Sequence, residues 1–436
     1  MQPSRLTYFT AFALFASLAA PALFSQAANN NQPRHYYVFN LGVPGGGTIA
    51  TPASVNNAGW VAGAAFQSGN TSEHAELWVG VPLDLGTFGG PNSAVAWPNK
   101  NNQGEIAGIA ETSEANPLQE NWSCALANFP TITNQVCLGF VWKDGVMSAL
   151  PTLGGYDGYA AGNNNRGQVA GWAENTVHDS TCVPPQVLQF EPVIWGPALG
   201  QLTQLPPLSG DVDGAATAIN DQGQAVGISG ICDQAVGRYT AKHAVLWENG
   251  VTTNLGNFDG GVAWNTPTAI NNRGEVVGFA NLANTPSGEL NPIAFVWTKS
   301  QPIQQLPLLG QDGNSLAWGI NNLGQVVGQS VGATSARAFL YQNGTITDLN
   351  ALTSPDSALY LLLANDINDR GEITGFALDS TTGDTVGFLA VPEPGTGAEQ
   401  PSAAGHTTSR SIEIPPNLLR QMPGFGRFAL GAIGTK

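Results

Sequence analysis

Aspartates recur at one position of this 436-residue chain, each in a short segment such as "YDG" or "VDG". The members are Asp157, Asp213, Asp259, Asp312 and Asp356, with Asn92 in "PNS" as a sixth. If these side chains surround one opening, they could hold a Ca²⁺ ion or accept hydrogen bonds from sugar hydroxyls. Asp-Gly is also what a tight turn requires. A turn role is therefore the first expectation and ligand binding the alternative, and no cofactor is predicted.

One aromatic residue, Trp122, stands beside Cys124 in a long segment of variable sequence. An exposed loop tryptophan can stack on a sugar ring, because one of its faces is apolar and its edge is polar. Packing beneath the same loop is the alternative. We include Trp122 as a candidate ligand-binding residue.

Catalytic motifs are missing from the chain. There is no G-x-S-x-G nucleophile turn, and no phosphate-binding glycine loop precedes a helix. A pair of acids could hydrolyse a glycosidic bond, but most acids here occupy turns. No catalytic residue and no resident metal site are predicted.

The element that positions these residues is a repeat of about 50 residues, a spacing typical of propeller blades. Each copy contains Asn-(Asn/Asp)-x-Gly, which predicts a tight turn because Asn and Asp tolerate positive φ and Gly adopts it freely. A short β-branched strand with a second glycine follows. The turn asparagines are Asn56, Asn101, Asn164, Asn220, Asn271, Asn321 and Asn368, and the turn glycines are Gly59, Gly104, Gly167, Gly223, Gly274, Gly324 and Gly371.

After that strand, most copies continue with an apolar strand that carries an aromatic residue, then a short turn and a fourth strand. "HAVLW", "ENG" and "TTNLG" are one example. Four strands in about 50 residues predict an all-β fold, a seven-bladed β-propeller with four-stranded blades. The last copy lacks a fourth strand, whereas "HYYVFNLG" at 35–42 precedes the first copy. We expect this N-terminal strand to close the last blade, with the propeller spanning 35–392.

Loop lengths distinguish two faces. The Asn-x-x-Gly turns are uniform, whereas the links between the second and third strands vary, and variable loops on a rigid scaffold commonly carry recognition. All four cysteines lie in these long links. We predict the pairs Cys124–Cys137 and Cys182–Cys232, although sequence alone leaves the connectivity open.

The repeats resemble those of the HAF-repeat extracellular proteins, named for a His-Ala-Phe signature. Its halves stand here as His74-Ala75 and His243-Ala244, and as Ala294-Phe295 and Ala338-Phe339. The resemblance covers roughly residues 36–391 and implies a secreted repeat protein. It brings no catalytic residues.

The two ends of the chain carry targeting features. Residues 1–27 have the basic start, apolar run and small-x-small cleavage site of a signal peptide. "VPEPG" at 391–395 resembles the start of a PEP-CTERM sorting signal, but the apolar span that completes such a signal is missing. We expect 393–436 to be a mostly disordered tail.

The net charge of −16 disfavours a nucleic-acid partner, which needs a basic surface. We predict a monomeric protein without a membrane span, secreted to the exterior or the periplasm. It would bind an extracellular polysaccharide or surface protein through the long-loop face. The alternatives are a polysaccharide hydrolase or lyase with acids at the channel mouth, and a passive structural repeat protein.

Overall fold

The computed structural model describes residues 34–121, 123–124, 129–198, 200–232, 242–258, 265–283, 285, 291–333 and 335–394. The chain divides into two units, Met1–Gln32 and Pro33–Lys436, and every described residue belongs to the second. The predicted signal peptide, the tail from residue 395, and the candidates Trp122 and Asp259 lie outside the described residues.

The described part is almost entirely β-structure. We number its repeat units by the seven turn asparagines of the sequence. Unit 1 comprises β2 (Gly46–Val55), β3 (Val61–Gln67), β4 (Glu73–Val79) and β5 (Val81–Asp84). Unit 2 comprises β6 (Gly89–Ala94), β7 (Ile106–Ala115), β8 (Gln135–Lys143) and β9 (Val146–Ala149). Unit 3 comprises β10 (Gly158–Asn163), β11 (Val169–His178), β12 (Leu188–Trp195) and β13 (Leu202–Gln204).

Units 4 to 7 follow the same plan. Unit 4 comprises β14 (Asp213–Ile219), β15 (Ala225–Gly230), β16 (His243–Glu248) and β17 (Val251–Asn254), and unit 5 comprises β18 (Asn265–Ile270), β19 (Val276–Asn281), β20 (Pro292–Thr298) and β21 (Gln301–Gln305). Unit 6 comprises β22 (Asn314–Ile320), β23 (Val326–Val331), β24 (Ala336–Gln342) and β25 (Thr345–Asp348), and unit 7 comprises β26 (Leu359–Ile367), β27 (Ile373–Asp379) and β28 (Thr385–Pro392). A 3₁₀ turn, η1 (Leu349–Leu352), follows β25.

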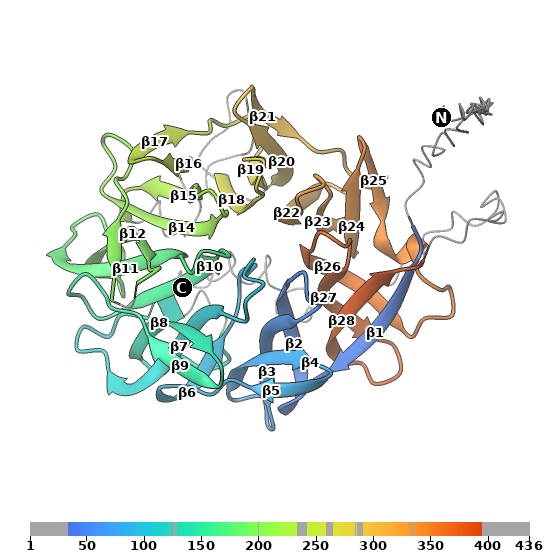
Figure 1. Cartoon of the computed structure of the whole chain (residues 1–436), viewed down its shortest axis with the longest axis horizontal. Helices are drawn as coiled ribbons and strands as arrows, with labels where there is room; N and C mark the ends of the chain where they lie inside the picture. The colour runs from blue at the N-terminus through green and yellow to red at the C-terminus, as the bar shows by residue number, and fades with distance from the viewer. Residues whose placement is uncertain are drawn as a thin grey trace, which may run out of the picture. The chain divides into compact units, whose positions relative to one another are not determined.

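Among the described residues, units 2 to 6 each form one four-stranded antiparallel sheet with its strands in chain order (Figure 1). Units 1 and 7 share an eight-stranded sheet, joined by the single parallel pair Ile49–Thr385. The first strands of successive units are in contact: β14 with β18, β18 with β22, β22 with β26, and β26 with β2. The fold is therefore all-β and of the propeller type.

The N-terminal strand β1 (Tyr36–Gly42) pairs antiparallel with β28, from Tyr36 opposite Pro392 to Gly42 opposite Gly387. It supplies the fourth strand that unit 7 lacks in sequence. Segments separated by almost the whole described chain thus share one sheet. No helix in the described ranges is long and apolar enough to cross a bilayer.

The second glycine of each repeat has a packing role. A Cβ on Gly171 would overlap the carbonyl oxygen of Tyr159 in the neighbouring strand, and one on Gly328 would overlap that of Leu316. The first strand carries a bulge just beyond this contact, between Ala160 and Gly162 in unit 3. Only glycine lets the two strands approach this closely.

Aromatic side chains fill the space between units and the centre. The third-strand tryptophans are buried, and three of them donate an indole N–H to a carbonyl oxygen: Trp78 to Leu41, Trp195 to Pro151 and Trp247 to Pro206. A central apolar cluster includes Trp97, Trp172, Phe279, Trp318 and Leu362, which come from five different units. Most of the described tryptophans outside the third strands are therefore core residues as well.

Candidate functional site: a basin among the asparagine turns

Each turn asparagine first organises its own turn. In unit 1, Asn56 Oδ1 accepts hydrogen bonds from the backbone N–H of Ala58 at 2.9 Å and of Trp60 at 3.0 Å. The same pair of bonds recurs in the other six units. The turn glycine has a positive φ, for example 81° at Gly59. These bonds leave the Asn Nδ2 group free to reach outward.

That Nδ2 group connects each unit to the next. Asn164 Nδ2 donates to the Asn220 carbonyl oxygen at 2.8 Å, and the equivalent bond runs from every unit to its successor. From unit 7 it returns to unit 1, where Asn368 Nδ2 donates to the Asn56 carbonyl oxygen at 2.8 Å. The seven asparagines therefore form a closed cycle of hydrogen bonds.

The residue after each turn asparagine forms a second closed cycle. Its backbone N–H donates to the side-chain Oδ1 of the corresponding residue in the next unit. The cycle ends where Asp369 N–H donates to Asn57 Oδ1 at 2.9 Å. The members are Asn57, Asn102, Asn165, Asp221, Asn272, Asn322 and Asp369. This second cycle explains why only Asn or Asp occupies the position, since each must accept a hydrogen bond.

The two cycles surround a cavity of about 260 Å³, which we call the basin. Its floor contains four aliphatic residues, Val55, Ile270, Ile320 and Ile367, and one cation, Lys100. Its walls are the side chains of the second cycle. These aliphatic residues are at most 3% exposed, so the surface that the basin offers to a ligand is mainly polar.

Two carboxylates in the wall are held by neighbouring amides. Asp221 Oδ2 accepts hydrogen bonds from Asn165 Nδ2 at 3.0 Å and Asn272 Nδ2 at 2.8 Å. Asp369 Oδ2 accepts one from each of Asn57 and Asn322, both at 2.9 Å. Burial opposes ionisation of Asp369, but these hydrogen bonds and the nearby Lys100 charge lower its pKa below the usual value. Asp369 is therefore ionised at neutral pH.

Lys100 is held to the floor by an ion pair with Asp366, and its Nζ also donates to the Ile367 carbonyl oxygen at 3.1 Å. The Asp366 side chain is fully buried, and that of Lys100 is 26% exposed. Burial raises the pKa of Asp366, while the attraction of Lys100 acts in the opposite direction. An ammonium group has three N–H donors, so one remains for the basin.

The aspartates singled out in the sequence lie elsewhere, at the ends of the strands opposite the asparagine turns. Asp157 Oδ1 accepts the backbone N–H of Cys137 at 2.9 Å, and Asp213 Oδ1 accepts that of Phe190 at 3.0 Å. Asn92 Oδ1 accepts the N–H of Glu73 at 3.0 Å in the same way. Each side chain thereby holds the third strand of the preceding unit. Asp157 and Asp213 are completely buried.

The other two described members of that set differ. Asp312 Oδ2 accepts hydrogen bonds from Arg337 at 2.6 Å and Ser330 at 2.7 Å, and Asp356 is exposed. The structure therefore does not gather Asp157, Asp213, Asp312 and Asp356 into one described cavity.

The pKa values of Asp157 and Asp213 differ strongly from those of free aspartates. Burial first, and then the nearby charge of Glu174, raise the pKa of Asp157 well above its usual value. Burial raises the pKa of Asp213 to about 9, and a hydrogen bond with Asp179 acts in the same direction. Asp213 is therefore protonated at neutral pH and can donate a hydrogen bond within the fold.

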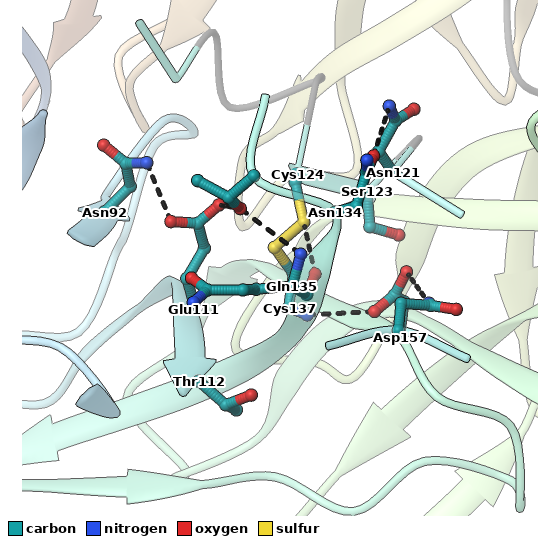
Figure 2. Close-up of a disulfide and its surroundings, with 12 residues drawn as sticks. Asn92, Glu111, Thr112, Asn121, Ser123, Cys124, Asn134, Gln135, Cys137 and Asp157 are labelled. Atoms are coloured by element: carbon teal, nitrogen blue, oxygen red, sulfur yellow. Dashed lines mark hydrogen bonds between the residues drawn. A yellow bond between two sulfur atoms is a disulfide. The ribbon is translucent and has the colours of Figure 1, made fainter. Parts of the chain in front are cut away.

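The cysteines pair as expected, Cys124 with Cys137 and Cys182 with Cys232. Figure 2 shows the first disulfide beside Glu111, which accepts a hydrogen bond from Asn92 at 2.7 Å. Among described residues, Glu111 and these two cysteines are the group of potential metal ligands in mutual reach. Because the two sulfurs are bonded to each other, they offer no thiolate to an ion. The disulfides are compatible with an oxidising compartment.

Sequence reasoning missed the basin. The signal was present in the second turn position, which is Asn or Asp in all seven copies, more than a turn alone requires. A second signal was Lys100, which stands where Val55, Ile219, Ile270, Ile320 and Ile367 stand in other copies. A cation at a position that is aliphatic in five other copies, and Asn163 in the third, marks a departure from the repeat.

No protein-family model and no curated protein matches the chain. Among solved structures, it is similar to the β-propeller domain of the trilobed protease from Pyrococcus furiosus, with 9% identity and a TM-score of 0.45 over 78% of this chain and 92% of that one. It is also similar to a streptogramin B lyase, with 11% identity and a TM-score of 0.43 over 81% and 97%. With the NanB sialidase from Streptococcus pneumoniae the identity is 9% and the TM-score 0.34, over 83% of this chain and 71% of that one. Likeness at this level assigns neither ligand nor activity.

Proposed function

We propose that the chain is a secreted, seven-bladed β-propeller that serves as a binding module, with the basin as its binding site. The N-terminal strand β1 completes the seventh blade and closes the ring. Support for seven blades comes from the hydrogen bonds that run from Asn56 through the turn asparagines and return from Asn368. Support for the closure comes from the pairing of β1 with β28.

The observation that carries the binding proposal is the fixed geometry of the basin wall. Seven side chains are each held by a backbone N–H of a neighbouring blade, so they need no reordering when a ligand arrives. A site that is already ordered loses less entropy on binding. We therefore place the site among the asparagine turns and not, as the loop lengths suggested, among the long links.

Binding is favoured over glycoside hydrolysis. Hydrolysis needs one carboxyl kept protonated beside an ionised one. In the basin Asp369 is held ionised, and two amides occupy its Oδ2. Burial raises the pKa of Glu174 and Glu191 to about 7, but both side chains are buried in the fold away from the basin.

The partner we propose is an extracellular polysaccharide or a surface protein, consistent with the resemblance to HAF-repeat extracellular proteins. The test uses the secreted full-length protein against immobilised extracellular polysaccharides and surface-protein fractions. The informative variant is Asn102→Asp, because its Oδ1 can still accept the Asn57 N–H at 2.7 Å while its free amide donor is lost.

The matched control is Asn254→Asp. Asn254 is also exposed, its Oδ1 also accepts a backbone N–H, from Gly256 at 2.8 Å, and it lies at the opposite end of the strands. Binding that weakens in Asn102→Asp and persists in Asn254→Asp supports the basin. Binding that persists in both variants removes the basin as the site.

A further inference from the structure

We infer that the basin holds an uncharged, polyhydroxylated ligand, a single sugar ring at the end of a polysaccharide chain. This inference rests on the proposed function and names the chemical class of its ligand. Two properties of the basin carry it: its size, and the distribution of its donors and acceptors.

The volume limits the ligand. At about 260 Å³, the basin is just below the range of roughly 300–1,000 Å³ that is typical of sites for drug-sized molecules. It lies inside two closed hydrogen-bond cycles, which fix the width of its mouth. One ring of a sugar is therefore accommodated, whereas an extended stretch of polymer is not.

Hydrogen-bond donors and acceptors both remain around the basin wall. The spare donors are one Nζ hydrogen of Lys100, the amide of Asn102, which bonds to no described residue, and the second amide hydrogen of each wall asparagine that bonds to Asp221 or Asp369. The acceptors are the carboxylates Asp221, from blade 4, and Asp369, from blade 7. Hydroxyl groups donate and accept, so a polyol satisfies both sides.

Charged ligands are disfavoured by the same arrangement. An anion would meet Asp221 and Asp369, and the positive charge of Lys100 is already compensated by the buried Asp366. A cation gains little, because Asp221 and Asp369 each already accept hydrogen bonds from two side-chain amides and one backbone N–H. Of the three arginines at the third turn position, Arg273 and Arg370 are paired with Glu275 and Glu372 at 2.6 Å, so Arg166 alone has no ion pair among the described residues.

The experiment measures competition for the polysaccharide by isothermal titration calorimetry with the full-length protein. The probes are neutral hexoses (glucose, galactose, mannose), glucuronate as the anionic counterpart and glucosamine as the cationic one. We expect at least one neutral hexose to bind and to displace the polysaccharide, and both charged sugars to bind at least tenfold more weakly. In Asn102→Asp the affinity for the neutral hexose should fall about tenfold, and in Asn254→Asp it should not change.

The outcomes separate the two proposals. If Asn102→Asp loses the polysaccharide but the charged sugars compete as well as the neutral hexoses, the ligand class is wrong and the basin remains the site. If the polysaccharide binds equally to both variants, both proposals are overturned. If a hexose binds in the basin but no polysaccharide binds to the protein, the ligand class is supported and the ligand is a free sugar. Failure of every neutral hexose to bind the folded protein overturns the inference.

Discussion

At the scale of a residue, Asp213 shows how a regular aspartate can serve the fold. Its Oδ1 accepts the N–H of Phe190, and it shares a proton with Asp179. Although burial opposes it, hydrogen bonds from Asp213 and Thr181 lower the pKa of Asp179. Asn92 occupies the equivalent position in blade 2 and makes the equivalent hydrogen bonds: its Oδ1 accepts the Glu73 N–H and its Nδ2 donates to Glu111. An amide and a protonated carboxyl are interchangeable in this role.

This equivalence makes a residue-scale prediction. Asp213→Asn keeps both hydrogen bonds, so its free energy of unfolding at pH 7 should equal that of the wild type. Asp213→Ala leaves the Phe190 N–H without a partner, removes one hydrogen bond from Asp179 and should cost about 1–3 kcal/mol. Chemical denaturation of the three proteins checks both values. Equal losses in the two variants would contradict the proton-sharing role.

At the scale of elements, one contact connects three blades at the seam of the ring. Lys100 follows β6 in blade 2, and Asp366 belongs to β26 in blade 7. Asp366 Oδ2 also accepts the N–H of Val55 in blade 1, at 3.0 Å. The corresponding pair in blade 5 is Ala269-Ile270, which is wholly apolar. The ion pair is therefore specific to the seam, where the first and last repeats meet.

Removing one partner of this pair should destabilise the protein. Lys100→Ile leaves a fully buried carboxylate unpaired, which costs about 3 kcal/mol. In the double variant Lys100→Ile/Asp366→Ala, which copies the blade 5 residues, most of that loss should be recovered. A double-mutant cycle by urea unfolding measures the coupling. Additive losses would show that the two side chains do not act together.

At the scale of the whole molecule, the proposed closure of the ring uses residues from both ends of the described chain, through the pairing of β1 with β28. Tyr36 is 4% exposed and packs with β28 residues such as Phe388 and Ala390 in one apolar cluster. Burial raises the pKa of Tyr36 to about 12. Without β1, the edge of β28 and this cluster would be open to water.

A truncation tests the closing strand. A chain that begins at Val43 should lose about 3–5 kcal/mol relative to one that begins at Pro33, because Tyr36, Val38 and the β1–β28 hydrogen bonds are removed. Thermal unfolding of the two proteins provides the measurement. Equal midpoints would mean that the ring does not need β1.

The buried acids predict an unusual pH dependence. Burial raises the pKa of Glu76, Glu174 and Glu191 to about 7 and that of Asp213 to about 9. Between about pH 4, where these groups titrate in the unfolded chain, and their folded values, the native state binds more protons. Its free energy of unfolding therefore falls as pH rises through this window. Below it, carboxyls with lowered pKa, such as Asp84 and Asp369, lose their contribution as they are protonated.

We expect the unfolding midpoint to be highest near pH 5 and to fall by several degrees toward pH 9. Glu191→Gln should flatten this decline, and Glu114→Gln, a change at an exposed acid, should not. Calorimetric scans across the pH range give the comparison. A midpoint that rises steadily from pH 5 to pH 9 would refute the assignment.

By itself, the sequence determined the strands and their order, whereas it left the predicted pairing of the cysteines for the structure to confirm. These follow from local rules, since Asn-x-x-Gly requires a turn, β-branched runs require strands, and a missing fourth strand in the last repeat has a counterpart in residues 35–42. What only the tertiary structure decided is how equivalent residues of different repeats face each other. The second turn position forms a wall because each side chain meets the next blade, and Asp213 is buried because Phe190 of another blade needs its oxygen. Such contacts join residues 23 positions apart for Phe190 and Asp213 and 51 positions apart for Asp221 and Asn272, and local sequence does not specify them.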